Sequence, residues 1–133
     1  MSKILGQTKD GSFQFGIRKT FALTLEDAWE FMFSEKGLNL WLGKPKQLFE
    51  LKQSFETAEG ISGFIRLIKH HSHIRMSWKK PEWDNYATLQ IRLIPNHEKT
   101  TISFHLEKLK NKNQRDEMTT YWTEVLTKIS EVI

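Results

Sequence analysis

The chain has 133 residues, no cysteine and a formal net charge of +4, from 20 Lys and Arg residues against 16 Asp and Glu residues. This length predicts one domain that buries roughly two-thirds of its unfolded surface. The absence of cysteine excludes disulfides and thiolate metal sites. The mild positive charge permits an anionic partner but does not require one.

No segment has the pattern of a targeting sequence or a membrane span. The first ten residues are polar and lack the apolar core of a signal peptide. No run approaches the ~20 apolar residues that cross a bilayer. We therefore expect a cytoplasmic protein, with a polar N-terminal lead over residues 1–12 and a single domain over residues 13–133.

The start of this domain predicts a strand followed by two short helices. Alternating apolar side chains over Phe13–Phe21 predict the strand. Thr24 and Ser34 each precede a helical pattern and are suited to cap it, and Gly43 ends the second helix.

From Leu48 onward the apolar pattern changes to a period of two, which predicts strands joined by turns. We expect these strands over Leu48–Phe55, Ile61–Lys69, His73–Lys79, Tyr86–Ile94 and Thr100–Leu109. The second and third of them form a hairpin over His70–Ser72.

The last stretch, Asn113–Ile133, has apolar residues at spacings of three and four, which places them on one face of a helix. These residues are Met118, Tyr121, Trp122, Val125, Leu126, Ile129 and Val132. Asn113 is the expected N-cap. Segregated strands before a one-sided helix predict an α+β fold, in which the helix lays its apolar face on an antiparallel sheet.

Several short segments, weak alone, are together typical of one superfamily. They are residues 17–21, Ala28-Trp29, residues 37–43, residues 72–78, residues 88–95, residues 100–105 and residues 107–109, followed by Arg115, Glu117, Met118 and Trp122. In this order they resemble the START-like superfamily, also called SRPBCC or helix-grip. Within it the chain resembles the branch named for the activator of the ninety-kilodalton heat-shock-protein ATPase, from about Phe13 to the C-terminus. Leu106 departs from this pattern, which would have a polar residue there.

The resemblance implies a curved antiparallel sheet of about six strands, wrapped around the long C-terminal helix with a cavity between them. Two short helices would close one end. Superfamily members bind lipids, sterols or polyketides, some are cyclases, and the namesake of the branch is a co-chaperone. We expect a domain that binds a small apolar or amphipathic ligand without catalysis. A co-chaperone-like protein-interaction module is the alternative, and a polyketide-cyclase-like enzyme is a third hypothesis.

Six residues are candidates for lining the cavity. They are Trp41, Trp78, Phe104, His105, Met118 and Trp122. A small-molecule site needs a mostly apolar lining with a few polar groups, although aromatic residues at this spacing are more often plain core. His105 reaches the cavity only if its strand face, opposite Ile102 and Phe104, is the concave one; otherwise it is a surface histidine.

Trp83 and Arg75 are candidates for an interaction surface. Trp83 lies in the turn-rich segment 80–85, where an aromatic side chain needs a partner protein, the cavity mouth or its own sheet edge to pack against. Arg75 belongs to the basic hairpin over residues 66–80, which an anionic surface would fit. Basic residues there alternate with apolar ones, as in any hairpin with one face in water, so we expect no nucleic-acid partner.

The sequence contains no catalytic or metal-binding motif. It lacks a G-x-S-x-G elbow and a phosphate-binding glycine loop. His70, His71 and His73 crowd the hairpin tip, but the neighbouring cations and the lack of acidic residues between Arg66 and Lys80 oppose a divalent metal. We expect no catalytic residue, no metal and no cofactor, and the sequence determines neither the ligand nor the oligomeric state.

Overall fold

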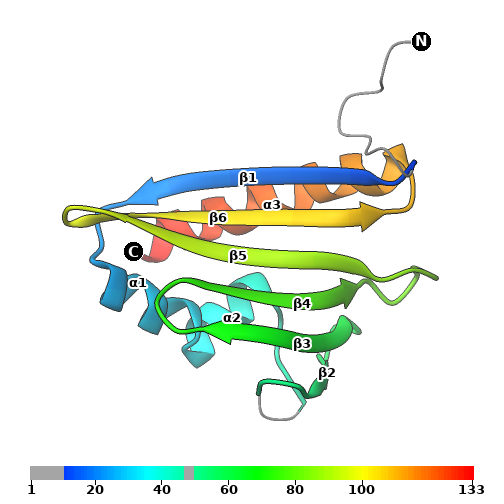
Figure 1. Ribbon diagram of the computed structural model, residues 1–133, viewed down its shortest axis with the longest axis horizontal. Coiled ribbons are helices and arrows are strands. Elements are labelled where there is room, and N and C mark those ends of the chain that lie inside the picture. The colour runs from blue at the N-terminus through cyan, green and yellow to red at the C-terminus, as the bar shows by residue number, and fades with distance from the viewer. Residues whose placement is uncertain (1–10, 47–49) are drawn as a thin grey trace.

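The computed structural model of the protein describes residues 11–46 and 50–133, and their elements follow the predicted order (Figure 1). The strands are β1 (Phe13–Phe21), β2 (Ser54–Glu56), β3 (Ser62–Lys69), β4 (His73–Lys79), β5 (Ala87–Asn96) and β6 (Lys99–Leu109). The helices are α1 (Leu25–Met32), α2 (Glu35–Trp41) and α3 (Lys112–Val132). Strands and helices are segregated along the chain, which confirms the predicted α+β class.

In the part of the chain that the structure describes, the strands form one antiparallel sheet in the order β1-β6-β5-β4-β3-β2. Consecutive strands from β2 to β6 are neighbours, as expected when short turns connect antiparallel strands. β1 and β2 lie at opposite edges, so the connection through α1 and α2 spans the width of the sheet.

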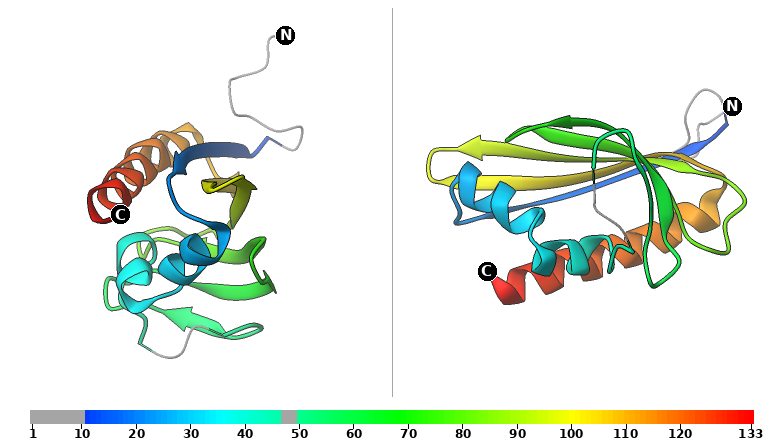
Figure 2. Two further views of the ribbon diagram at one scale, coloured as in Figure 1. Left: turned by 90° about the vertical axis from the view of Figure 1, so that its left-hand side faces the viewer. Right: turned by 90° about the horizontal axis from the view of Figure 1, so that it is seen from below.

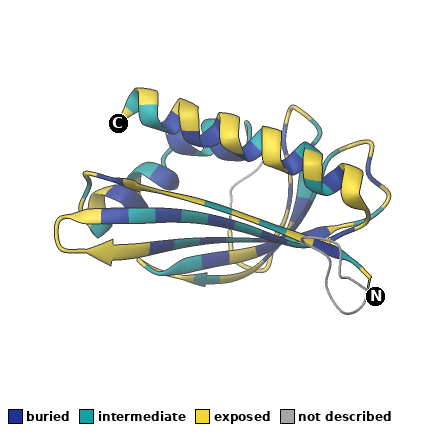
Figure 3. Cartoon of the chain, turned by 90° about the horizontal axis from the view of Figure 1, so that it is seen from above, coloured by how far each residue is buried: buried dark blue, intermediate teal, exposed yellow. Residues whose placement is uncertain are grey.

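The sheet curves around the helices, and α3 lies along its concave side together with α1 and α2 (Figure 2). Alternation along β5 and β6 points every second residue towards α3, where Ile91, Ile102 and Phe104 are fully buried. α3 contributes a buried stripe that includes Met118 and Trp122 (Figure 3). The core therefore lies between sheet and helix, which confirms the helix-grip arrangement.

Polar caps begin the two short helices where the sequence predicts them. Oγ1 of Thr24 accepts a hydrogen bond from the backbone N–H of Asp27 at 3.2 Å, and Oγ of Ser34 accepts one from Gly37 at 3.1 Å. Gly43 follows α2 with a φ of +113°, a left-handed conformation that favours glycine. The caps thus mark where α1 and α2 begin, and Gly43 marks where α2 has ended.

The predicted start of α3 is wrong by two residues. Asn111, not Asn113, is the N-cap, and its side chain accepts a hydrogen bond from the backbone N–H of Gln114 at 2.8 Å. Both asparagines precede the same apolar stripe, so the stripe alone does not distinguish them. None of the described helices is long and apolar enough to cross a membrane.

The strand predicted over Leu48–Phe55 begins only at Ser54. Lys52 has a φ of +59°, which an extended strand does not allow, and its backbone N–H instead donates to the carbonyl of Ile65 at 2.7 Å. Residues 48 and 49 of this prediction lie outside the described residues, and so do residues 1–10 of the predicted N-terminal lead.

Candidate functional site

Aromatic side chains from three elements meet between the sheet and α3. Trp78 of β4, Phe104 of β6 and Trp122 of α3 are fully buried. The rings of Phe104 and Trp122 stack with their centroids 4.7 Å apart, and the ring of Trp78 lies 5.8 Å from that of Trp122. Met118, one helical turn before Trp122, is also fully buried. The structure thus brings four of the six cavity candidates into one layer, where the three rings pack on one another.

Two of these rings carry a polar group without a partner. Nε1 of Trp78 and Nε1 of Trp122 are buried and have no hydrogen-bond acceptor among residues 11–46 and 50–133. A buried donor without an acceptor costs about 1–3 kcal/mol. Trp41, the fifth candidate, is also fully buried, but its Nε1 donates to the carbonyl of Met32 at 2.7 Å. Trp41 therefore ties α2 to the end of α1.

His105, the sixth candidate, lies on the outer face of the sheet. Its neighbours Phe104 and Leu106 are fully buried towards α3, so the alternation of β6 turns His105 away from the helix. Its side chain is 37% exposed, and its Nδ1 lies 3.6 Å from Oε1 of Glu107. His105 is thus a surface histidine and does not occupy the concave position on which a ligand role depends.

The two interaction candidates differ in accessibility. Trp83 is buried, because its ring packs edge-to-face on Trp78 at 5.5 Å and its Nε1 donates to Oε1 of Glu117 at 3.3 Å. This loop aromatic therefore finds its partner inside its own domain. Arg75 is exposed on the outer face of β4, opposite Gln90 of β5. Of the two, only Arg75 is accessible to a partner.

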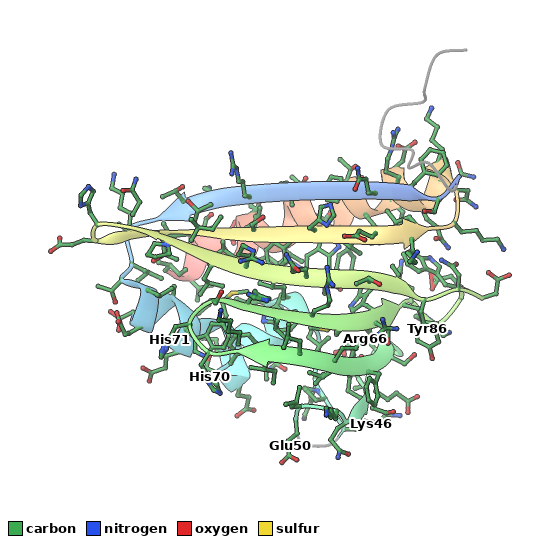
Figure 4. All side chains as sticks on the ribbon, viewed as in Figure 1. Lys46, Glu50, Arg66, His70, His71 and Tyr86 are labelled. Atoms are coloured by element: carbon green, nitrogen blue, oxygen red, sulfur yellow. The ribbon has the colours of Figure 1, made fainter. Side chains whose placement is uncertain are left out.

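The histidines of the β3–β4 turn do not converge on one point. The rings of His70 and His71, which Figure 4 labels, lie 5.7 and 5.8 Å from the ring of Trp29. Nδ1 of His73 is hydrogen-bonded to Oγ of Ser72 at 2.9 Å. No group of three potential metal ligands occurs anywhere in the described part of the chain.

A groove with a volume of about 420 Å³ opens between α2 and α3, and we call it the α2–α3 groove. Its apolar floor combines Leu40 of α2, Leu42 at the C-cap of α2, Ile61 before β3, Pro81 of the β4–β5 loop and Val125 of α3. Four separate segments therefore build this site. None of the six predicted cavity residues lines it.

Charged side chains surround the floor. Lys80 pairs with Glu117 and with Glu82, whose Oε2 lies 3.3 Å from Nζ of Lys80. Burial opposes the charge on Lys80, but its hydrogen bonds to the two carboxylates and their charges outweigh this and raise the pKa of Lys80. Elsewhere on the rim, Glu59 accepts a hydrogen bond from the backbone N–H of Lys44 at 3.0 Å, which lowers the pKa of Glu59.

Tyr121 lies between this groove and the buried aromatic rings. It lines the groove, and its ring centroid lies 5.1 Å from that of Trp122 and 5.7 Å from that of Trp78. Burial raises the pKa of the Tyr121 hydroxyl, which keeps it protonated near neutral pH. One ring therefore separates the groove from the two indoles that lack an acceptor.

Sequence reasoning did not predict this groove. Tyr121 and Val125 belong to the apolar stripe predicted for the last helix. The opposite wall comes from turns that meet only in the folded sheet: a Cβ atom on Gly60 would lie 3.0 Å from Cγ of Pro81. Gly60 and Pro81 mark turns in the sequence, but nothing in the sequence shows that these two turns touch.

Solved structures share this fold, whereas no curated protein matches the chain in sequence. CalU16 from Micromonospora echinospora has a TM-score of 0.81 and 17% identity, over 94% of this chain and 79% of its own. PFC0360w, an HSP90 activator from Plasmodium falciparum, has a TM-score of 0.76 and 17% identity, over 90% of this chain and 94% of its own. The Aha1 dimer from Colwellia psychrerythraea has a TM-score of 0.72 and 10% identity, over 87% and 92%. At these identities the likeness shows the fold alone.

The family follows from the sequence over most of the chain. A family model described as "Activator of Hsp90 ATPase homolog 1-like protein" matches residues 22–133. This span begins directly after β1 and contains α1, α2, the strands β2 to β6 and α3. The chain therefore belongs to the family of activator of Hsp90 ATPase homolog 1-like proteins, within the START-like superfamily that its sequence resembles.

Proposed function

We propose that the protein binds a small amphipathic molecule in the α2–α3 groove and performs no chemistry on it. One observation supports this above all: a groove with an apolar floor and a charged rim opens where four separate segments meet. The groove volume of about 420 Å³ falls within the roughly 300–1,000 Å³ that is usual for small-molecule sites. An apolar ligand with a polar head group suits this floor and rim.

The apolar floor alone does not supply enough binding free energy. Burying about 150 Å² of apolar ligand surface contributes about 4 kcal/mol, which only matches the low end of the cost of association. Polar contacts must add the rest. Lys128 on the rim has no carboxylate within 4.0 Å among the described residues, so an anionic head group would find an unpaired cation there.

The titratable groups of the groove favour binding over proton transfer. The pKa of Lys80 is raised, the pKa of Glu59 is lowered, and the pKa of Tyr121 is raised. Each shift moves the group further from neutral pH, whereas a general acid or base works best with a pKa near the working pH. These three groups therefore hold their charge state and suit ligand orientation.

The test uses 1-anilinonaphthalene-8-sulfonate, an aromatic sulfonate whose fluorescence rises in apolar sites, with laurate as a competitor and a thermal shift as a second readout. Leu40→Trp fills the groove and should weaken binding of both probes by about tenfold or more. Leu67→Trp, on the outer face of β3, makes the same substitution away from the groove and should leave affinity unchanged. The proposal fails if neither probe binds, or if the two variants bind the probes equally well.

A further inference from the structure

Five cationic side chains gather on the outer face of the sheet, the face away from α3. They are Arg18, Arg66, Lys69, Arg75 and Arg92, and we call them the cationic face. Strand register aligns three of them: Arg18 neighbours Ser103, Ser103 neighbours Arg92, Arg92 neighbours His73, and His73 neighbours Lys69. Strands are about 4.8 Å apart, so neighbouring cations in this row are separated by about 10 Å at their backbones.

The other two cations of this face adjoin the row. Arg75 lies opposite Leu67 and Gln90, and Arg66 lies in the bulge of β3 between Ile65 and Leu67. Figure 4 looks onto this face and labels Arg66. Four of the five cations are arginines, whose planar guanidinium binds carboxylates through two parallel hydrogen bonds.

Acidic side chains do not neutralise this face. Two of its carboxylates are Glu107, which lies beside His105, and Glu56 at the β2 edge, whose Oε2 lies 3.6 Å from Nζ of Lys46. Across the described residues, no carboxylate lies within 4.0 Å of any of the five cations. On the helical side, α1 and α3 carry seven acids: Glu26, Asp27, Glu30, Asp116, Glu117, Glu124 and Glu131.

His73 shows that these cations act together. Burial lowers the pKa of His73, and the positive charges of Arg92, Lys69 and Arg75 on the strands around it lower it further. Residues of three strands thus direct positive charge at one imidazole, which disfavours a further positive charge there. Negative charge from a partner would relieve this repulsion.

The form of this face favours a protein segment over the other polyanions. The row of Arg18, Ser103, Arg92, His73 and Lys69 carries one ring, the imidazole of His73, and so offers no series of rings on which successive nucleobases could stack. The face is convex (Figure 2), so a flat lipid surface would contact only its middle. Phe64 and Leu67 are 39% and 43% exposed beside Arg66 and Arg75, which suits apolar residues among acidic ones. We propose that the cationic face docks an acidic peptide segment of a partner protein that also carries apolar side chains.

The test measures fluorescence anisotropy of a labelled peptide of repeated Glu-Glu-Leu. Arg75→Glu combined with Arg92→Glu should weaken binding by about tenfold or more, because each reversal replaces an attraction with a repulsion. Lys36→Glu combined with Lys112→Glu changes the net charge equally but on the helical side, and should change affinity less than twofold. Circular dichroism establishes that both variants fold.

A second measurement needs no variant. In a proton NMR titration of the unmodified protein, saturating peptide should raise the pKa of His73, because bound carboxylates offset the surrounding cations. The proposal is overturned if the peptide does not bind, if both double variants lose affinity equally, or if the pKa of His73 does not rise. It is also overturned if polyuridylate or phosphatidylserine vesicles bind this face and the peptide does not. Leu40→Trp leaves this binding intact, so failure here is separate from failure of the groove proposal.

Discussion

Replacing Trp122 by Phe should leave the stability of the protein nearly unchanged or raise it, although this side chain is fully buried. Loss of the second ring opens a void of roughly 40 Å³, which at about 24 cal/mol per Å³ costs about 1 kcal/mol. The same change removes a buried N–H that has no acceptor among the described residues, which recovers about 1–3 kcal/mol. The two effects together predict a change between about 0 and 2 kcal/mol in favour of the folded state.

Trp41→Phe is the matched control, since Trp41 is equally buried but its Nε1 donates to the carbonyl of Met32 at 2.7 Å. The void again costs about 1 kcal/mol. Removing the donor from this carbonyl adds about 1–3 kcal/mol. Trp41→Phe should therefore destabilise the protein by about 2–4 kcal/mol, at least about 2 kcal/mol more than Trp122→Phe.

Urea unfolding followed by far-ultraviolet circular dichroism measures both changes without depending on tryptophan fluorescence. The comparison is valid if the free energy of unfolding of each variant falls with urea concentration at the same slope as that of the unmodified protein. Equal destabilisation by Trp122→Phe and Trp41→Phe would refute the reasoning, because it would mean that Nε1 of Trp122 already has a partner, such as a buried water.

Two further predictions concern pH and helix capping. The pKa of His73 is lowered in the folded protein, so as the pH falls the unfolded protein binds a proton at this histidine first. The free energy of unfolding should therefore fall as pH falls through about 6.5. Urea unfolding at pH 7.5 and 5.5 should show a smaller fall for His73→Asn than for the unmodified protein, and an equal fall would count against the assignment of this pH dependence to His73. Asn111→Ala should cost about 1 kcal/mol by removing the cap of α3, whereas Asn113→Ala should cost less, as judged by urea unfolding.

Local signals predicted most of the fold. The caps at Thr24 and Ser34, the hairpin over His70–Ser72 and the apolar stripe of the last helix each depend on residues close together in the chain, and the structure has all of them. The errors arose where two local choices are similar. Asn111 and Asn113 are both suitable caps, and the alternating residues before Phe55 do not reveal that Lys52 adopts a left-handed conformation.

The candidate site was harder to predict, because its parts come from distant segments. Burial of Trp78, Phe104 and Trp122 follows from periodicity, but the same periodicity cannot tell a cavity wall from a packed ring. Only the folded chain shows that these rings touch and that the groove lies on the far side of Tyr121. Trp83 illustrates the same limit: a loop tryptophan was expected to need a partner, and its partner proved to be Trp78.

The two proposed sites lie on opposite sides of one sheet, and β4 connects them. The side chain of Trp78 points into the core behind the α2–α3 groove, while the side chain of Arg75 belongs to the cationic face on the other side of the sheet. Both flanks of β4 are paired, with β3 and with β5, so neither ligand can shift the strand without breaking ladder hydrogen bonds. Substitutions at well-separated sites with no shared partners usually have additive effects. The fold therefore favours independent binding: Leu40→Trp should weaken binding only at the small-molecule site, and reversal of Arg75 and Arg92 only at the peptide site.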